Sequence, residues 1–213
     1  MKSGFCFRPT ISGLLAVLLF LGKLEAAEIQ SIQMLADRCK ACHGVQFEGD
    51  VKFDAPALAG LNSWYIERQL LNFKKGIRGV GLEDVIGNQM RSNTITLTSV
   101  EIVKLSKRIS RIQSLPQRPS LVGNKSAGEN HFSRCATCHG RDGRGNQGYG
   151  ILSAPNLSNQ PDWYIVRQLK NFRNGLRGTH PKDAHGNKMR QAALNLPDDQ
   201  AIYDVAAWIS SVK

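Results

Sequence analysis

The sequence RCKACHG spans residues 38–44, and RCATCHG follows 96 positions later, at residues 134–140. In each copy two residues separate the cysteines, and histidine directly follows the second cysteine. On a helix, positions i, i+3 and i+4 share one face. C-x-x-C-H is the attachment pattern of c-type haem, with both sulfurs bonded to the macrocycle and the imidazole on iron. The pattern predicts two covalent haem c groups. The predicted attachment residues are Cys39, Cys42, Cys135 and Cys138, and the predicted iron-binding histidines are His43 and His139.

Two other interpretations suit four cysteines. In an exported protein they can form two disulfides, and paired C-x-x-C units can bind zinc. The histidine after each pair and the repetition of the whole pattern favour haem. The fifth cysteine, Cys6, precedes an apolar run and is not placed as a lipid-attachment residue.

The N-terminal residues have the pattern of a secretory signal peptide. Lys2 and Arg8 make a basic start, an apolar run covers residues 11–21, and small residues follow at Ala26 and Ala27. The run is short for a membrane span, so we predict a signal peptide over residues 1–27 and a periplasmic mature protein. A retained N-terminal anchor is the less favoured alternative.

The repetition extends through most of the chain. DAPALAGLNSWYIERQLLNFKKGIRG, starting at residue 54, is echoed by SAPNLSNQPDWYIVRQLKNFRNGLRG, starting at residue 153. GNQMR at residue 87 is echoed by GNKMR at residue 186. Repeats of this length indicate two structural units. We predict domains at 28–115 and 121–213, joined by a linker at 116–120 within the proline-containing sequence LPQRPS.

Each unit is predicted to be helical. The first helix of the first unit is expected to end at His43. The first helix of the second unit is expected to end with residues 132–139, at His139. SAGE at 126–129 and TSVE at 98–101 fit capping boxes, the second beginning a helix that runs to about Ile112. Apolar residues recur at helical spacing within 64–73 and 163–172, and the last helix is expected to start near Pro197. No convincing alternating strand is present.

A sixth iron ligand is predicted from the methionines. Met90 and Met189 occupy the same place in both copies, between Gly-Asn and Arg. A methionine is often core filler, but this pairing favours iron ligation, which raises the reduction potential. The rival ligands are histidines found in the second unit without a histidine at the aligned position of the first, and His185 is the main one.

Other repeated residues suggest supporting roles. The backbone carbonyls of Pro56 and Pro155 are candidates to accept a hydrogen bond from the ligating imidazoles. Repeated arginines and the indole N–H groups are candidates to bind haem propionates. The arginine pairs are Arg38/Arg134, Arg78/Arg177 and Arg91/Arg190, and the tryptophans are Trp64 and Trp163.

These motifs together resemble class I c-type cytochromes, and their tandem arrangement resembles the dihaem cytochrome c4 family over nearly the whole mature chain. The resemblance implies an all-α protein of two cytochrome c folds related by an approximate twofold. It also implies His43/Met90 and His139/Met189 ligation, and electron transfer from a quinol–cytochrome c reductase toward a terminal oxidase.

The leading functional prediction is an electron carrier rather than an enzyme. The alternatives are a haem enzyme of the peroxidase or thiosulfate-oxidising type and a dedicated electron-transfer subunit of a dehydrogenase. The net charge of +11 suits an acidic redox partner or loose association with an anionic membrane surface. Nucleic acid is not expected as a partner, because the basic and aromatic stretches belong to the repeated helices.

Overall fold

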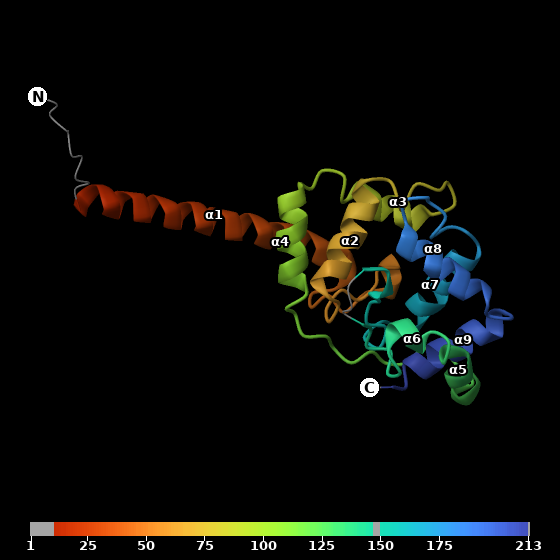
Figure 1. Cartoon of the computed structure of the whole chain (residues 1–213). Helices are drawn as coiled ribbons and strands as arrows, with labels where there is room; N and C mark the ends of the chain where they lie inside the picture. Colours follow the sequence, from red (N-terminus) through yellow and green to blue (C-terminus); the bar gives the residue numbers. More distant parts are fainter. Residues whose placement is uncertain (1–10, 147–149, 213) are drawn as a thin grey trace, which may run out of the picture.

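The computed structural model describes residues 11–146 and 150–212, and the regular elements of that part are all helices joined by loops (Figure 1). Its sheet-type pairing there consists of two isolated bridges, Asp50–Ala55 and Asn146–Ala154. Cys6, the first ten residues of the predicted signal peptide, and three residues of the longer second haem loop lie outside the described residues. The predicted all-α class is confirmed.

The first unit contains four α-helices and a short 3-10 helix: α1 (Ile11–His43), η1 (Val51–Phe53), α2 (Ser63–Lys74), α3 (Val85–Ser92) and α4 (Ser99–Ile109). The second unit repeats this order with a divided first helix: α5 (Lys125–Phe132), α6 (Ala136–His139), η2 (Gly150–Leu152), α7 (Asp162–Arg173), α8 (Ala184–Leu194) and α9 (Asp199–Ile209). The predicted linker 116–120 lies between α4 and α5. The exact domain boundaries remain a prediction.

The first helix of the first unit is long, and its N-terminal part projects away from the body of the protein (Figure 1). Residues 11–27 of this helix belong to the predicted signal peptide, which also remains a prediction. Within the part of the chain that can be described, no helix combines the length and the apolar character needed to cross a membrane.

The N-terminal caps of α4 and α9 agree with the sequence-based predictions, whereas the cap of α5 does not. Thr98 and Glu101 form the predicted capping box of α4, and the Asp198 side chain accepts from Ala201 N at the start of α9. The predicted box at 126–129 is wrong. Asn124 caps α5 instead, because its side chain accepts from Ala127 N and starts the helix ahead of Ser126.

Two predicted helix bounds also need correction. Phe132 and His139 do not share one helix, because a tight turn with Cys135 N bonded to Phe132 O, at 2.7 Å, separates α5 from α6. The α4 helix ends at Ile109, three residues before Ile112, since the next turn is closed by tighter bonds such as Ile112 N to Ile109 O.

In the second unit, α5 and α9 approach each other more closely than the side chains at the matching positions of the first unit would allow. Gly128 of α5 faces the backbone of α9, where a Cβ would overlap the Asp204 carbonyl oxygen. Four residues later Phe132 stacks on Trp208, with ring centroids 4.3 Å apart. By the 96-residue offset, Ile32 and Ala36 stand at these positions in the first unit. The larger side chain thus stands at the first of these two positions in the first unit and one helical turn later in the second.

We expect Gly128→Ala to lower the free energy of unfolding of the second unit by about 3 kcal/mol, because the added methyl group must push α5 away from α9. Chemical denaturation followed by absorbance measures the change. Ser126→Ala, an exposed position on the same helix, is the control and should have little effect. Equal stabilities of the two variants would contradict this account of the crossing.

Candidate haem-binding sites

Both histidines of the C-x-x-C-H patterns are buried and held by the predicted carbonyls. His43 ends α1 and His139 ends α6, with exposed fractions of 7% and 4%. Their Nδ1 atoms lie 2.9 and 3.0 Å from the carbonyl oxygens of Pro56 and Pro155, respectively. A carbonyl can only accept, so Nδ1–H donates and Nε2 keeps its lone pair, the form that binds a metal. Burial lowers the pKa of both imidazoles, although the carbonyls act in the opposite direction.

No disulfide joins any of the four cysteines of the two patterns. The disulfide interpretation is therefore not supported. Within the described part of the chain, no group of three or more His, Cys, Asp or Glu side chains is arranged to hold a metal ion. Burial raises the pKa of the Cys39 and Cys135 thiols.

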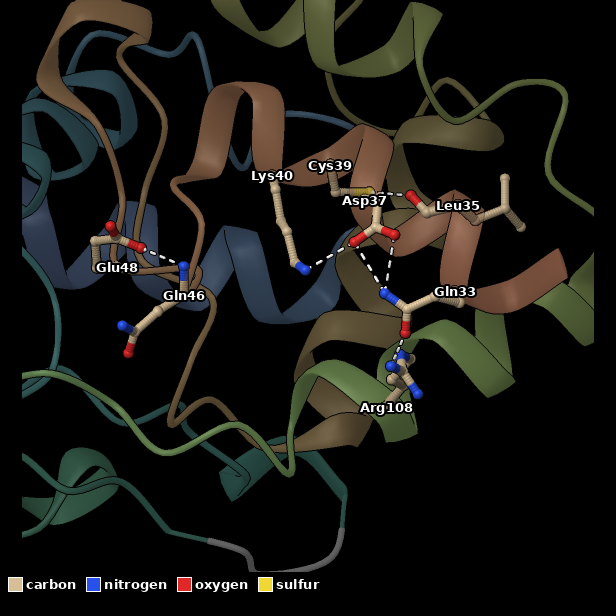
Figure 2. Close-up of polar contacts among 8 residues, drawn as sticks. All are labelled: Gln33, Leu35, Asp37, Cys39, Lys40, Gln46, Glu48 and Arg108. Carbon is tan, nitrogen blue, oxygen red and sulfur yellow. Dashed lines mark hydrogen bonds and ion pairs between the residues drawn. The ribbon is translucent and has the colours of Figure 1, made fainter. Parts of the chain in front are cut away.

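Polar contacts fix the last turns of α1, which carry the first site (Figure 2). Asp37 accepts from Lys40 Nζ at 2.7 Å and from Gln33 Nε2 at 2.9 Å, and the hydrogen bond from Lys40 is the main cause of its lowered pKa. Gln33 in turn accepts from Arg108 of α4. Figure 2 also shows Cys39 Sγ directed at the Leu35 carbonyl, 3.3 Å away. These contacts tie the cysteine-bearing turns to the terminal helix.

Both sets of predicted haem residues line one continuous cavity. It measures about 2230 Å³, counting its openings to solvent. In each unit the histidine and the methionine reach the cavity from different helices. His43 and His139 come from α1 and α6, and Met90 and Met189 come from α3 and α8. Its lining includes Cys39, Cys42, His43, Met90, Cys135, Cys138, His139 and Met189. The structure thus brings together every predicted attachment and ligand residue.

The rival ligand His185 also lines this cavity. Its Nε2 lies 3.1 Å from the Gly150 carbonyl oxygen and therefore donates to it. His180 is engaged elsewhere, because its Nδ1 accepts from Lys182 N at 3.1 Å. Met189, which matches Met90 in position, remains the better candidate for the second iron.

Two glycines with backbone angles in the left-handed region pack against the first turns of α3 and α8, the helices that carry the methionines. Gly79 has φ +74° and Gly178 has φ +79°, and a Cβ at either would overlap the carbonyl oxygen of Gly87 or Gly186 in the first turn of α3 or α8. Only glycine allows both this φ and this approach without strain. The glycines therefore set where each methionine meets the cavity.

We expect Gly79→Ala to cost about 3 kcal/mol of stability and to weaken methionine ligation in the first unit, since α3 must move. Gly81→Ala is the matched control, because it lies in the same loop and its Cβ would meet ordinary contact with Asp84 at 3.9 Å. Urea denaturation and the near-infrared absorption of the oxidised protein measure both effects. A Gly79→Ala protein as stable as the control would refute the proposed role.

Arginines and glutamines from the two units join in a reciprocal network beside the cavity. Arg78 donates to Gln69 Oε1 at 2.8 Å and to Gln168 Oε1 at 3.1 Å. Arg177 donates to Gln168 at 2.7 Å and to Gln69 at 3.0 Å. Each arginine thus bridges its own unit to the other, as expected for an approximate twofold. The glutamines were not predicted, although their repetition in the two RQL segments was an available signal.

The Tyr65 side chain also contacts this network, and the arginines lower its pKa. Its hydroxyl lies 3.3 Å from Arg177 Nη2. Burial acts to raise the pKa of Tyr65, but the guanidinium groups of Arg177 and Arg78 bring it below its ordinary value. Two buried guanidinium groups close together favour a further negative charge nearby.

Buried N–H groups without protein partners test whether the cavity suits haem. Leaving a buried donor unpaired costs roughly 1–3 kcal/mol, so such a set indicates an acceptor supplied by a ligand. Among the described residues the unpaired donors are Trp64 Nε1 and the Nε atoms of Arg68, Arg91, Arg177 and Arg190. Arg68 and Arg177 line the cavity itself. Apolar walls, buried neutral histidines and unpaired cationic donors all fit a haem with its propionates.

Comparison with known proteins agrees with this geometry. The cytochrome c family matches the chain twice, over residues 29–107 and 126–213. Cytochrome c4 of Thiocapsa roseopersicina is 30% identical and aligns with 82% of this chain and 86% of its own length. A thiosulfate dehydrogenase electron acceptor of Stutzerimonas stutzeri strain A1501 is 27% identical, over 95% of this chain and 94% of its own. The solved structure of Acidithiobacillus ferrooxidans cytochrome c4 superposes with a TM-score of 0.65 at 28% identity, covering 81% of this chain and 98% of that one.

The fold, the two C-x-x-C-H sites and these matches define a tandem c-type cytochrome, an electron carrier whose domains imply covalently bound haem c. The chain belongs to the cytochrome c4 family.

Proposed function

We propose that the chain binds two haem c groups and carries electrons between respiratory proteins of the periplasm. In this proposal Cys39 and Cys42 attach one haem and Cys135 and Cys138 attach the other. The axial pairs are His43 with Met90 and His139 with Met189. The observation that carries the proposal is the shared cavity, which both complete sets of residues line.

Haem bound in these sites would supply one-electron iron chemistry. The chain's own residues bind and tune it. The Pro56 and Pro155 carbonyls orient the imidazoles, and the apolar walls of the cavity would exclude water from a bound haem. The paired arginines, oriented by Gln69 and Gln168, would stabilise the propionate charge of bound haem. If His and Met both bind the iron of each haem, no position would remain open for a substrate, as suits a carrier.

We propose that the electrons come from quinol oxidation by a quinol–cytochrome c reductase and go to a terminal oxidase. A second donor is a thiosulfate dehydrogenase, because the relative named as its electron acceptor aligns along nearly all of this chain. Both roles need an exported protein, which the predicted signal peptide over residues 1–27 supports.

The test compares the two donors. The oxidised protein is mixed with quinol and purified reductase, or with thiosulfate and purified thiosulfate dehydrogenase, and haem reduction is timed. Faster reduction by the reductase at equal enzyme concentration supports the respiratory role. Faster reduction by the dehydrogenase would replace it with the second role. Reduction by neither at a catalytically useful rate would defeat both.

A further inference from the structure

The two units present the same backbone around their methionines. We call residues 79–90 rim 1 and residues 178–189 rim 2. In each rim an aspartate caps the following helix, with Asp84 accepting from Gly87 N at 3.0 Å and Asp183 from Gly186 N at 2.9 Å. Each rim ends on the predicted ligand that lines the cavity. Differences between the rims therefore lie in their side chains.

Rim 1 is apolar where rim 2 is polar or small. The side chains of Val80, Leu82 and Val85 are 55%, 99% and 68% exposed. The aligned positions of rim 2, by the 99-residue offset, hold a threonine, a proline and an alanine. Exposed apolar side chains scattered singly are ordinary, but these three lie within six residues, in the loop before α3 and at its first residue. Rim 1 and rim 2 therefore present different surfaces to a partner protein.

Charge separates the rims further. Rim 2 carries Lys182 and Lys188 where rim 1 carries Glu83 and Gln89, and all four side chains are exposed. Over the described ranges neither lysine forms an ion pair. Lys188 also lines the cavity beside Met189. Rim 2 therefore places free positive charge at the mouth of the second haem site.

We propose that rim 2 is the docking face for a redox protein whose own electron-transfer site is surrounded by carboxylates, and that rim 1 does not receive that partner. Complementary charge at the contact raises the encounter rate and orients the partner, by factors of roughly 10 to 1000 at low salt. The transfer moves one electron from the partner's reduced cofactor to oxidised iron, and no bond changes. The inference rests on the proposed carrier function and adds to it the face and the chemistry of one partner.

Reduced flavodoxin, an acidic one-electron donor protein, serves as the probe. It is mixed with the oxidised holoprotein in a stopped-flow instrument over a range of ionic strength. The test variant Lys182→Glu/Lys188→Gln gives rim 2 the residues of rim 1. The matched control, Lys107→Glu/Lys125→Gln, makes the same change in net charge at exposed positions on α4 and α5. The reverse variant, Glu83→Lys/Gln89→Lys, gives rim 1 the charges of rim 2.

We expect the test variant to lose about tenfold in second-order rate at low ionic strength and to lose most of its salt dependence. The control should stay within about twofold of the unaltered protein, and the reverse variant should react faster because it has a second basic face. Equal losses in the test variant and the control would overturn the proposal, since net charge alone would then explain them. An unchanged rate in the test variant would overturn it as well.

Reduction by dithionite separates this proposal from the carrier function. If dithionite reduces two haems but flavodoxin reacts at a rate independent of salt, rim 2 is not a docking face and the carrier function stands. If dithionite fails to reduce two haems, the carrier function itself fails, and the docking proposal fails with it.

Discussion

Replacing Met90 or Met189 by alanine, one at a time, is expected to remove half of the weak near-infrared sulfur-to-iron absorption and to lower the reduction potential of one haem only. A thioether ligand favours the reduced iron, and its loss leaves a weaker ligand or water in its place. Because axial ligands move haem potentials over a range of about 0.8 V, a fall of roughly 100 mV or more is expected at the altered site.

Met34→Ala is the matched control for both variants. Met34 lies on α1 with its side chain 57% exposed, and it should leave the absorption and both potentials unchanged. Retention of the full absorption in the Met189→Ala protein would contradict His139/Met189 ligation. His185, which lines the same cavity, would then be the residue to replace next.

The second large effect is expected at the contact between the units. Arg177→Met should lower the free energy of unfolding by about 3 kcal/mol, because it leaves the Tyr65 hydroxyl without its charged donor and takes one of two charged donors from each of Gln69 and Gln168. Arg78→Met should cost less, since the Arg78 side chain is less buried than that of Arg177.

The double variant tests whether the units act together. The two arginines share both glutamine acceptors, so the loss in the double variant should differ from the sum of the single losses by more than about 0.5 kcal/mol. Denaturation by guanidinium chloride, followed by haem absorbance in the holoprotein, gives all three values. Additive losses would show that the network does not couple the units.

The candidate haem residues could be predicted from the sequence because the attachment pattern depends on local spacing, and all of them line the cavity. Cysteines at i and i+3 and a histidine at i+4 are defined within one turn of helix. The repeat singled out Met90 and Met189 by position, and their ligation of iron stays a prediction. The two proline carbonyls were also predicted, and both hydrogen bonds are present. The family and the all-α fold followed from the same motifs.

Features that depend on tertiary contacts were missed or misplaced. Asn124 rather than Ser126 caps α5, because several side chains compete for the same backbone N–H groups and the sequence does not show which one bonds. The turn that divides α5 from α6 was not visible in a segment that is continuous helix in the first unit. The bridging glutamines Gln69 and Gln168 act across the two units, and sequence spacing within one unit cannot show such a contact.

The most direct test of the account is the optical spectrum of the purified protein, oxidised and reduced, with haem counted as the pyridine haemochrome. We expect two covalent haems per chain, low-spin throughout, with the sulfur-to-iron absorption at two-haem intensity. A single haem, a high-spin component, or absorption from only one methionine-bound iron would contradict paired His/Met sites.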